Sequence, residues 1–275
     1  MSSPQKRVLC LHGYSQNASM FSKKLAALRQ QLPEVELVFI DALHVLQPVD
    51  LPAPSQMGYF SGFDSEPPSK EPQRGWWKTQ NVQSIAAGLE VTLAQLKDVL
   101  KEQGVFNGVL GFSQGAVLAA LLSGLLEKPE TYPLFLEDGK AVHPPFEFCI
   151  SVAGYKPLDP LGAKLLTPNF KTPTLHVIGH NDIIVTPERS QSLIDASLNG
   201  RVEFHDGGHF VPSKTAWRKF LAETLVISVR ACTKYFPTLK SSSSLHNLQK
   251  KQSPMRTTGR FEDFRDPSLP PVQDA

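Results

Sequence analysis

The short motif GFSQG at residues 111–115 constrains the possible fold of this chain more than any other feature. Residues 106–110 before it form a short apolar run, and residues 116–126 after it form a longer run typical of a buried helix. A serine where a strand turns directly into a helix sits on a strained turn that holds its hydroxyl clear of the sheet. This context predicts a nucleophile elbow with Ser113 as nucleophile. The alternative is an ordinary glycine-rich turn with an incidental serine.

Apolar runs and helical periods alternate along the rest of the chain. The predicted strands are residues 7–11, 35–40, 106–110, 146–152, 174–178 and 202–205. The predicted helices are residues 18–32, 82–103, 116–126, 187–198 and 213–233. Strands that alternate with helices imply right-handed crossovers between parallel strands. The predicted fold class is therefore α/β, with a mostly parallel central sheet of about six strands and helices on both faces.

Composition divides the chain at Pro237. Residues 1–237 carry all the predicted elements and are expected to form one catalytic domain, with loop or lid insertions at about 42–78 and 127–145. Residues 238–275 contain four consecutive serines, a lysine pair and closing prolines, with few apolar residues to offset the entropy of ordering. This tail is predicted to be disordered.

Charge and cysteine content exclude several classes of protein. The formal net charge of +2 gives no sign of the basic surface that a nucleic-acid partner requires. Cys10, Cys149 and Cys232 are odd in number and widely spaced, which argues against a disulfide framework and for a reducing compartment.

No apolar stretch approaches the roughly 20 residues that span a bilayer, and the apolar run before His12 is too short for a secretory signal. A cytoplasmic protein without a membrane span is predicted.

The acid of a serine triad follows the nucleophile in the sequence and precedes the histidine. Asp182 comes just after the predicted strand at 174–178, where ligand sites gather in open α/β sheets. The alternative for Asp182 is a structural role in a turn. Asp159 lies in a proline-rich segment, Asp195 falls within a helix, and Asp206 is too close in sequence to the candidate histidine. We therefore predict Asp182 as the acid.

His209 is the candidate base, because it follows the last predicted strand in a Gly-Gly turn and directly precedes the closing helix. His176 falls within a strand, and His246 falls in the tail. His205 and His209 are spaced like a pair of zinc ligands, but that pair needs a helix and the two glycines between them disfavour one. No metal site is predicted.

An oxyanion hole in this arrangement takes one backbone N–H from the residue after the nucleophile and one from the loop after the first strand. The first donor is then the N–H of Gln114. The second is the N–H of Tyr14, where Gly13 allows the backbone to approach the substrate closely. Taken alone, His12-Gly13 would be a plain turn that ends a strand.

Aromatic residues gather in the long segment between the second predicted strand and the next helix. The candidates for substrate contact are Tyr59, Phe60, Phe63, Trp76 and Trp77. For Trp76 and Trp77, anchoring of the loop to the core is an equal alternative, because large aromatic side chains also dominate core packing.

Several stretches together resemble the FSH-type family of small serine hydrolases. They are VLCLHGYSQN at 8–17, DALH at 41–44, RGWW at 74–77, GVLGFSQGA at 108–116, LHVIGHND at 175–182 and GGHFVP at 207–212. The resemblance covers about residues 5–230 and implies a small α/β-hydrolase fold with sheet order 2-1-3-4-5-6. It places the family's triad on Ser113, Asp182 and His209. Leu43 departs from the family, which often has proline there.

These features predict a serine hydrolase that cleaves small-molecule carboxylic esters through an acyl-enzyme and needs no cofactor. Apolar acyl groups are expected from the aromatic loop. One alternative is a thioesterase that releases an acyl or polyketide chain from an acyl-carrier partner. Another is a binding protein that reuses the fold without catalysis, although such a protein can dispense with the histidine or the acid, and both are present here.

Overall fold

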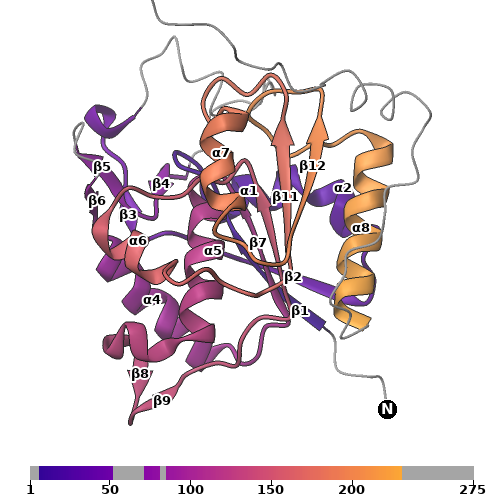
Figure 1. The fold of residues 1–275 in the computed structure, drawn as a ribbon. Coiled ribbons are helices and arrows are strands. Elements are labelled where there is room, and N and C mark those ends of the chain that lie inside the picture. The colour runs from indigo at the N-terminus through magenta and orange to yellow at the C-terminus, as the bar shows by residue number, and fades with distance from the viewer. Residues whose placement is uncertain (1–5, 52–70, 81–84, 231–275) are drawn as a thin grey trace, which may run out of the picture. The chain divides into compact units, whose positions relative to one another are not determined.

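The computed structural model describes residues 6–51, 71–80 and 85–230, and its centre is a six-stranded parallel sheet (Figure 1). The strands are β1 Lys6–Leu11, β2 Val35–Ile40, β7 Gly108–Phe112, β10 Phe148–Val152, β11 Thr174–Gly179 and β12 Gly200–His205. Their order across the sheet is β2-β1-β7-β10-β11-β12. Counted along the chain this is 2-1-3-4-5-6, so the predicted fold class and strand order are confirmed.

Every residue of the central strands β7, β10 and β11 is buried, whereas the edge strands β2 and β12 keep partly exposed side chains. Short apolar runs of this kind are expected where helices cover both faces of a parallel sheet. Because all six strands run the same way, the loops after β1, β7, β11 and β12 emerge at one edge. That edge is where Ser113, Asp182 and His209 meet.

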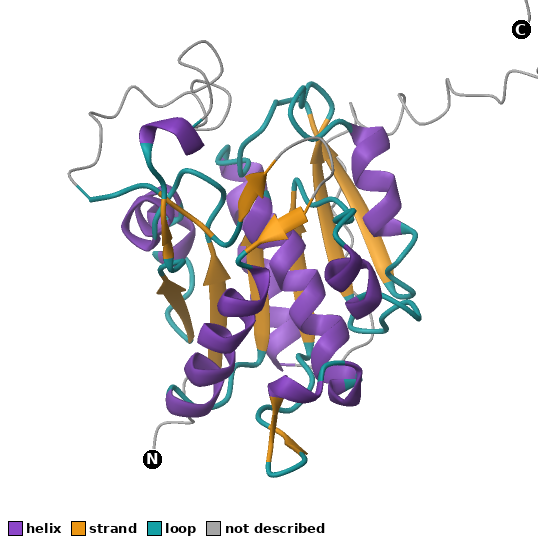
Figure 2. Ribbon diagram, turned by 90° about the vertical axis from the view of Figure 1, so that its left-hand side faces the viewer, coloured by secondary structure: helices purple, strands orange, loops and turns teal. Residues whose placement is uncertain are grey.

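Helices cover both faces of the sheet. They are α1 Ala18–Lys24, α2 Ala26–Arg29, α4 Leu89–Glu102, α5 Gln114–Glu127, α6 Pro160–Leu165, α7 Pro187–Ile194 and α8 Thr215–Arg230. Helices α1, α2 and α8 lie on one face, and α4, α5, α6 and α7 lie on the other (Figures 1 and 2). Helix α5 packs against β7 and β10 and is buried from Gln114 to Leu126, which seals the centre of the core.

Two predicted helices differ most from the structure, and the helix expected over 187–198 ends earlier, at Ile194. The helix expected over 82–103 begins at Leu89, because Gly88 adopts a left-handed φ of 94°. Within the described part of that range, Ile85–Ala87 forms strand β6, which pairs with β5 at Lys78–Gln80. The helix expected over 18–32 is two short helices that meet at Leu25.

The segments predicted as loops contain short elements. Strand β3 His44–Val45 pairs with β4 Arg74–Gly75, and a 3₁₀ turn lies between them at Pro48–Asp50. The second segment holds 3₁₀ turns at Pro129–Thr131 and Pro133–Phe135, then the hairpin of β8 Leu136–Glu137 and β9 Lys140–Ala141.

Helix α6 was not expected from the sequence. The carboxylate of Asp159 accepts hydrogen bonds from the N–H groups of Leu161 and Gly162, and Pro160 takes the first helical position. This is a strong N-terminal cap.

All described residues belong to one compact unit that ends at Pro237. The second unit, Thr238–Ala275, lies outside the described residues, as does the disorder predicted for it. Within the described ranges, no helix combines the length and the apolar character needed to cross a membrane.

Candidate active site

Ser113 stands on a strained turn between β7 and α5. Its φ of 53° and ψ of −117° lie where non-glycine residues are rare. A Cβ at Gly111 would collide with the carbonyl of Gly115, and a Cβ at Gly115 would collide with the carbonyls of Leu11 and His12. Gly115 therefore lets α5 pack directly on the end of β1, and Gly111 lets β7 approach the first turn of α5 closely. Strain like that at Ser113 is typical of functional sites.

The side chains of Ser113, His209 and Asp182 form one hydrogen-bonded chain. His209 Nε2 lies 2.9 Å from Ser113 Oγ, and His209 Nδ1 lies 2.8 Å from Asp182 Oδ2. The side chains of the histidine and the aspartate are 2% and 1% exposed. With the Nδ1 proton donated to the carboxylate, the neutral imidazole presents Nε2 as an acceptor for the serine hydroxyl.

Backbone amides fix the Asp182 carboxylate. Its Oδ1 accepts hydrogen bonds from the N–H groups of Ile184 at 2.9 Å and Val185 at 2.8 Å. Oδ2 is thereby left for His209. The alternative acids have other partners: the carboxylate of Asp159 caps α6, and that of Asp195 accepts from the side chain of Gln191.

Phe112 and the turn before His209 both help to position the His209 ring. The Phe112 ring lies 5.0 Å from the His209 ring, measured between centroids, and a Cβ at Gly13 would lie 2.8 Å from Phe112 Cδ1. His205 ends β12, and its Nδ1 accepts a hydrogen bond from the Gly207 N–H at 3.2 Å. His205 therefore shapes the turn that carries His209.

The other predicted alternatives lie apart from this chain of hydrogen bonds. Burial lowers the pKa of both His176 and His205 to about 4, so both rings are neutral at pH 7. His246 is outside the described residues. Among the described residues, no group of three or more histidine, cysteine or acidic side chains is placed to hold a metal ion.

The loop after β1 carries the predicted oxyanion donor Tyr14. Its conformation depends on His12, whose Nε2 accepts from the Ala42 N–H at 3.1 Å and whose Nδ1–H donates to the Gly13 carbonyl at 2.8 Å. Burial lowers the pKa of His12 to about 4, which keeps the ring neutral and suits it to one accepted and one donated bond. The Gly13 N–H in turn donates to the side chain of Gln16 at 3.1 Å.

The side chain of Gln114 has a role that was not predicted. Its Oε1 accepts from the Trp76 N–H and its Nε2 donates to the Trp77 carbonyl, both at 2.8 Å. The Trp76 indole N–H donates to the His12 carbonyl at 2.8 Å. Gln114 therefore ties the segment around Trp76 to the start of α5, and Trp76 ties it to the loop that carries Tyr14.

Trp76 and Trp77 are 0% and 4% exposed and belong to the hydrophobic core. The structure thus places both indoles where the core-anchoring alternative expected them, and their contact with a substrate stays a prediction. Tyr59, Phe60 and Phe63 lie outside the described residues.

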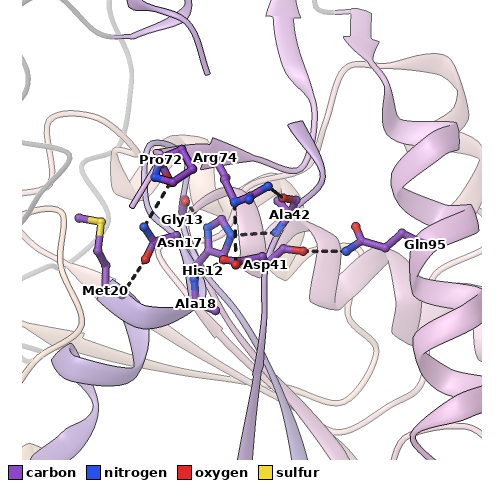
Figure 3. Close-up of polar contacts among 10 residues, drawn as sticks. All are labelled: His12, Gly13, Asn17, Ala18, Met20, Asp41, Ala42, Pro72, Arg74 and Gln95. Atoms are coloured by element: carbon purple, nitrogen blue, oxygen red, sulfur yellow. Dashed lines mark hydrogen bonds and ion pairs between the residues drawn. The ribbon is translucent and has the colours of Figure 1, made fainter. Parts of the chain in front are cut away.

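Asp41, Ala42 and Arg74, for which no role was predicted, meet beside the loop after β1 (Figure 3). The Arg74 side chain donates to the Ala42 carbonyl at 2.9 Å and lies 3.8 Å from the Asp41 carboxylate. The Arg74 N–H donates to the Gln16 carbonyl at 2.8 Å. The DALH and RGWW stretches therefore brace the loop after β1. Their match to the resembled family was the signal available in the sequence.

Comparison with known proteins identifies the family of this chain. The family model described as Serine hydrolase (FSH1) matches residues 1–221. Esterase OVCA2 of Danio rerio is 36% identical over 233 residues, which cover 80% of this chain and 96% of the fish protein. Esterase OVCA2 of Homo sapiens is 35% identical over 234 residues, which cover 78% of this chain and 95% of the human protein.

A solved structure supports the fold. Acyl-protein thioesterase 2 of Zea mays superposes with a TM-score of 0.55 at 18% sequence identity, over 82% of this chain and 94% of the maize chain. The sheet order, the strained serine turn and the family match over residues 1–221 lead to one conclusion. This chain is an enzyme of the α/β-hydrolase fold and belongs to the FSH1 serine hydrolase family.

Proposed function

We propose that this enzyme hydrolyses carboxylic esters with apolar acyl groups, using Ser113 as nucleophile, His209 as general base and Asp182 as the acid that orients the base. The observation that carries the proposal is the unbroken hydrogen-bonded chain from the Asp182 carboxylate through His209 to the Ser113 hydroxyl. A serine hydroxyl is a weak nucleophile until an adjacent base takes its proton, and this geometry supplies that base.

The reaction proceeds in two acyl transfers. Ser113 Oγ attacks the ester carbonyl carbon while His209 Nε2 takes the hydroxyl proton, and the tetrahedral intermediate then expels the alcohol, which receives that proton. Water attacks the acyl-enzyme with the same histidine as base and releases the carboxylic acid. Asp182 stabilises the imidazolium that forms in each half. The chemistry requires no cofactor.

Two backbone amides are proposed to bind the negative charge that develops on the carbonyl oxygen. Gln114 is the first residue of α5, so its N–H has no acceptor within the helix and carries the positive end of the helix dipole. Tyr14 supplies the second N–H from the loop braced by His12. Such preorganised donors are often the largest single contribution to catalysis.

The preference for apolar acyl groups rests on the rim of the site. Leu158 and Ile183 lie in the loops after β10 and β11, at the sheet edge that carries Ser113, and are 80% and 62% exposed. Large apolar side chains exposed at the sheet edge that carries the nucleophile favour an apolar ligand. The contact predicted for Tyr59, Phe60 and Phe63 would add to this surface.

We expect kcat/KM to rise with acyl length along a p-nitrophenyl ester series that begins at acetate. Each buried methylene contributes roughly 0.8 kcal/mol, or about fourfold in kcat/KM, until the acyl site is full. Medium and long acyl esters should therefore be better substrates than acetate, and charged acyl groups should be poor ones.

A matched pair of variants locates the acyl site. Leu158→Ser should reduce the rise in kcat/KM with acyl length. Leu134→Ser removes a side chain of similar exposure, 74%, from the 3₁₀ turn before β8 and should leave the rise unchanged. A steady decline from acetate onward in the wild-type enzyme would rule out the apolar acyl site without affecting the triad.

The thioesterase alternative uses the same acyl-enzyme and differs only in the leaving group. Parallel ester and thioester panels with one acyl group distinguish the two activities. Faster hydrolysis when the thiol is presented on a carrier protein would support a carrier partner.

The absence of a nucleic-acid partner and the cytoplasmic location stay predictions from the sequence. The free, buried thiols of Cys10 and Cys149 are consistent with a reducing compartment.

We propose residues 1–237 as the catalytic domain, because the sheet and the candidate site lie entirely between residues 6 and 230. An enzyme truncated after Pro237 should keep its melting temperature and its esterase kcat, since changes away from packed elements usually shift stability by no more than about 0.5 kcal/mol. Differential scanning fluorimetry and the p-nitrophenyl assay measure both. A large loss in either would show that the tail contributes to the folded domain.

A further inference from the structure

The buried His12 ring contacts two backbone peptide groups. His12 is fully buried, and its ring bonds two backbone groups that are 29 residues apart in the chain, the Ala42 N–H and the Gly13 carbonyl. The Gly13 carbonyl belongs to the same planar peptide group as the Tyr14 N–H. In a trans peptide the C=O and the N–H point in opposite directions. The bond from His12 to Gly13 therefore fixes the direction of the Tyr14 N–H.

The Asp41–Ala42 peptide group lies on the other side of the His12 ring. The Ala42 N–H that His12 accepts shares its peptide with the Asp41 carbonyl, and that carbonyl accepts a hydrogen bond from Gln95 Nε2 at 2.7 Å. Figure 3 shows these residues in succession, from Gln95 on α4 to the loop after β1. Gln95 begins the succession as a donor, and the Asp41–Ala42 peptide and the His12 ring each accept on one side and donate on the other.

All the links run in the same direction. Gln95 donates to the Asp41 carbonyl, the Ala42 N–H donates to His12 Nε2, and His12 Nδ1–H donates to the Gly13 carbonyl. Aligned hydrogen bonds polarise one another, so each link makes the next N–H a stronger donor. The chain ends on the Tyr14 N–H, which the proposed function assigns to the oxyanion hole.

We propose that His12 is a positioning residue for catalysis: its neutral ring relays a one-way hydrogen-bond chain from Gln95 and the Asp41–Ala42 peptide to the peptide that presents the Tyr14 N–H. This inference rests on the proposed function, since it concerns the oxyanion donor of that reaction. The Gly13 carbonyl also accepts from the Gln16 N–H at 3.2 Å. The bond from His12, at 2.8 Å, is the shorter of the two.

Two substitutions of His12 separate its two bonds. The carboxamide of asparagine reaches the position of Nδ1, so His12→Asn keeps a donor to the Gly13 carbonyl and loses the acceptor for Ala42. The longer glutamine reaches the position of Nε2, so His12→Gln keeps the partner of Ala42 and loses the donor to Gly13. Each variant loses one buried hydrogen bond, and their melting temperatures should fall by similar amounts.

His12→Gln should lower kcat by about 10²-fold with little change in KM, as expected when an oxyanion donor is lost. His12→Asn should retain most of the wild-type kcat. The affinity of an alkylboronic acid, which forms a tetrahedral adduct on Ser113, should fall in His12→Gln by the same factor as kcat. The fraction of active enzyme, titrated with a fluorophosphonate to completion, normalises each value.

His143 provides a matched control. Its buried ring makes the same pair of bonds, with Nε2 accepting from the Phe106 N–H at 2.8 Å and Nδ1 donating to the carbonyl of the next residue, Pro144, at 2.6 Å. It lies before β7 and β10, at the opposite edge of the sheet from Ser113. His143→Asn and His143→Gln should lower the melting temperature while leaving kcat per active site unchanged.

The result that overturns the proposal is an equal loss of kcat in His12→Asn and His12→Gln, or retention of full kcat in His12→Gln. A loss of kcat in the His143 variants would attribute the effect to general destabilisation and would overturn it as well. A different result would contradict the proposed function itself, namely ester turnover that persists in Ser113→Ala.

Discussion

Ser113→Ala is expected to abolish covalent labelling by a fluorophosphonate probe and to lower ester turnover by about 10⁶-fold, as the loss of a catalytic serine does in a serine protease. The reason is chemical, because Oγ is the atom that His209 activates and that carries the acyl group. Alanine leaves the strained turn in place, since the φ of 53° is set by the packing of α5 on β1. Intact-protein mass spectrometry measures the labelling, and a continuous ester assay measures the turnover.

Ser123→Ala is the matched control. Ser123 is also buried on α5, and its hydroxyl donates to the Ala119 carbonyl at 2.8 Å, one turn earlier in the helix. This variant should keep both labelling and turnover. Labelling that persists in Ser113→Ala and maps to another residue would show that the nucleophile is wrongly assigned.

The parts of this molecule that the sequence predicted depend on local patterns. Short apolar runs identified the six strands, and the strand-turn-helix context of GFSQG identified the elbow. The positions of Asp182 and His209 followed because parallel strands bring their carboxyl ends to one edge. The three side chains lie together in one hydrogen-bonded chain, and their catalytic roles stay a prediction.

The parts that were not predicted depend on backbone conformation at single residues. Apolar residues continue at helical spacing from Ile85 into α4, so periodicity alone extended the helix too far. A glycine is tolerated in helices at some cost, and the sequence does not show that Gly88 adopts a left-handed φ. Helix α6 was not predicted because a proline-rich segment usually indicates a loop, although proline is also favoured at the first helical position, which Pro160 occupies.

Hydrogen bonds and ion pairs between residues far apart in the sequence were also not predicted. Gln114 was expected to contribute only its N–H, because nothing in the sequence tells that its side chain meets Trp76, 38 positions earlier. The ion pair of Arg74 with Asp41 likewise depends on the path of a long connection. Trp76 and Trp77 were ambiguous for a physical reason, since the same aromatic area suits a core and an acyl pocket.

Asp182→Asn is expected to lower kcat by about 10⁴-fold, as the comparable change does in a serine protease. The structure gives the reason. Asp182 Oδ1 accepts from the Ile184 and Val185 N–H groups, and those donors will hold the amide oxygen of asparagine in the same place. The amide NH₂ then faces His209 Nδ1, where it can only donate. The ring is forced to carry its proton on Nε2, which can no longer accept the proton of Ser113.

Asp206→Asn serves as the control. Asp206 is exposed and lies three residues from His209, so it tests whether a nearby negative charge is sufficient. It should leave kcat almost unchanged, whereas Asp182→Asn should lose kcat while its melting temperature stays close to that of the wild type, because the asparagine keeps both amide contacts. Steady-state kinetics with one p-nitrophenyl ester compares the two variants. A large loss in Asp206→Asn together with a small one in Asp182→Asn would transfer the role of the acid to Asp206.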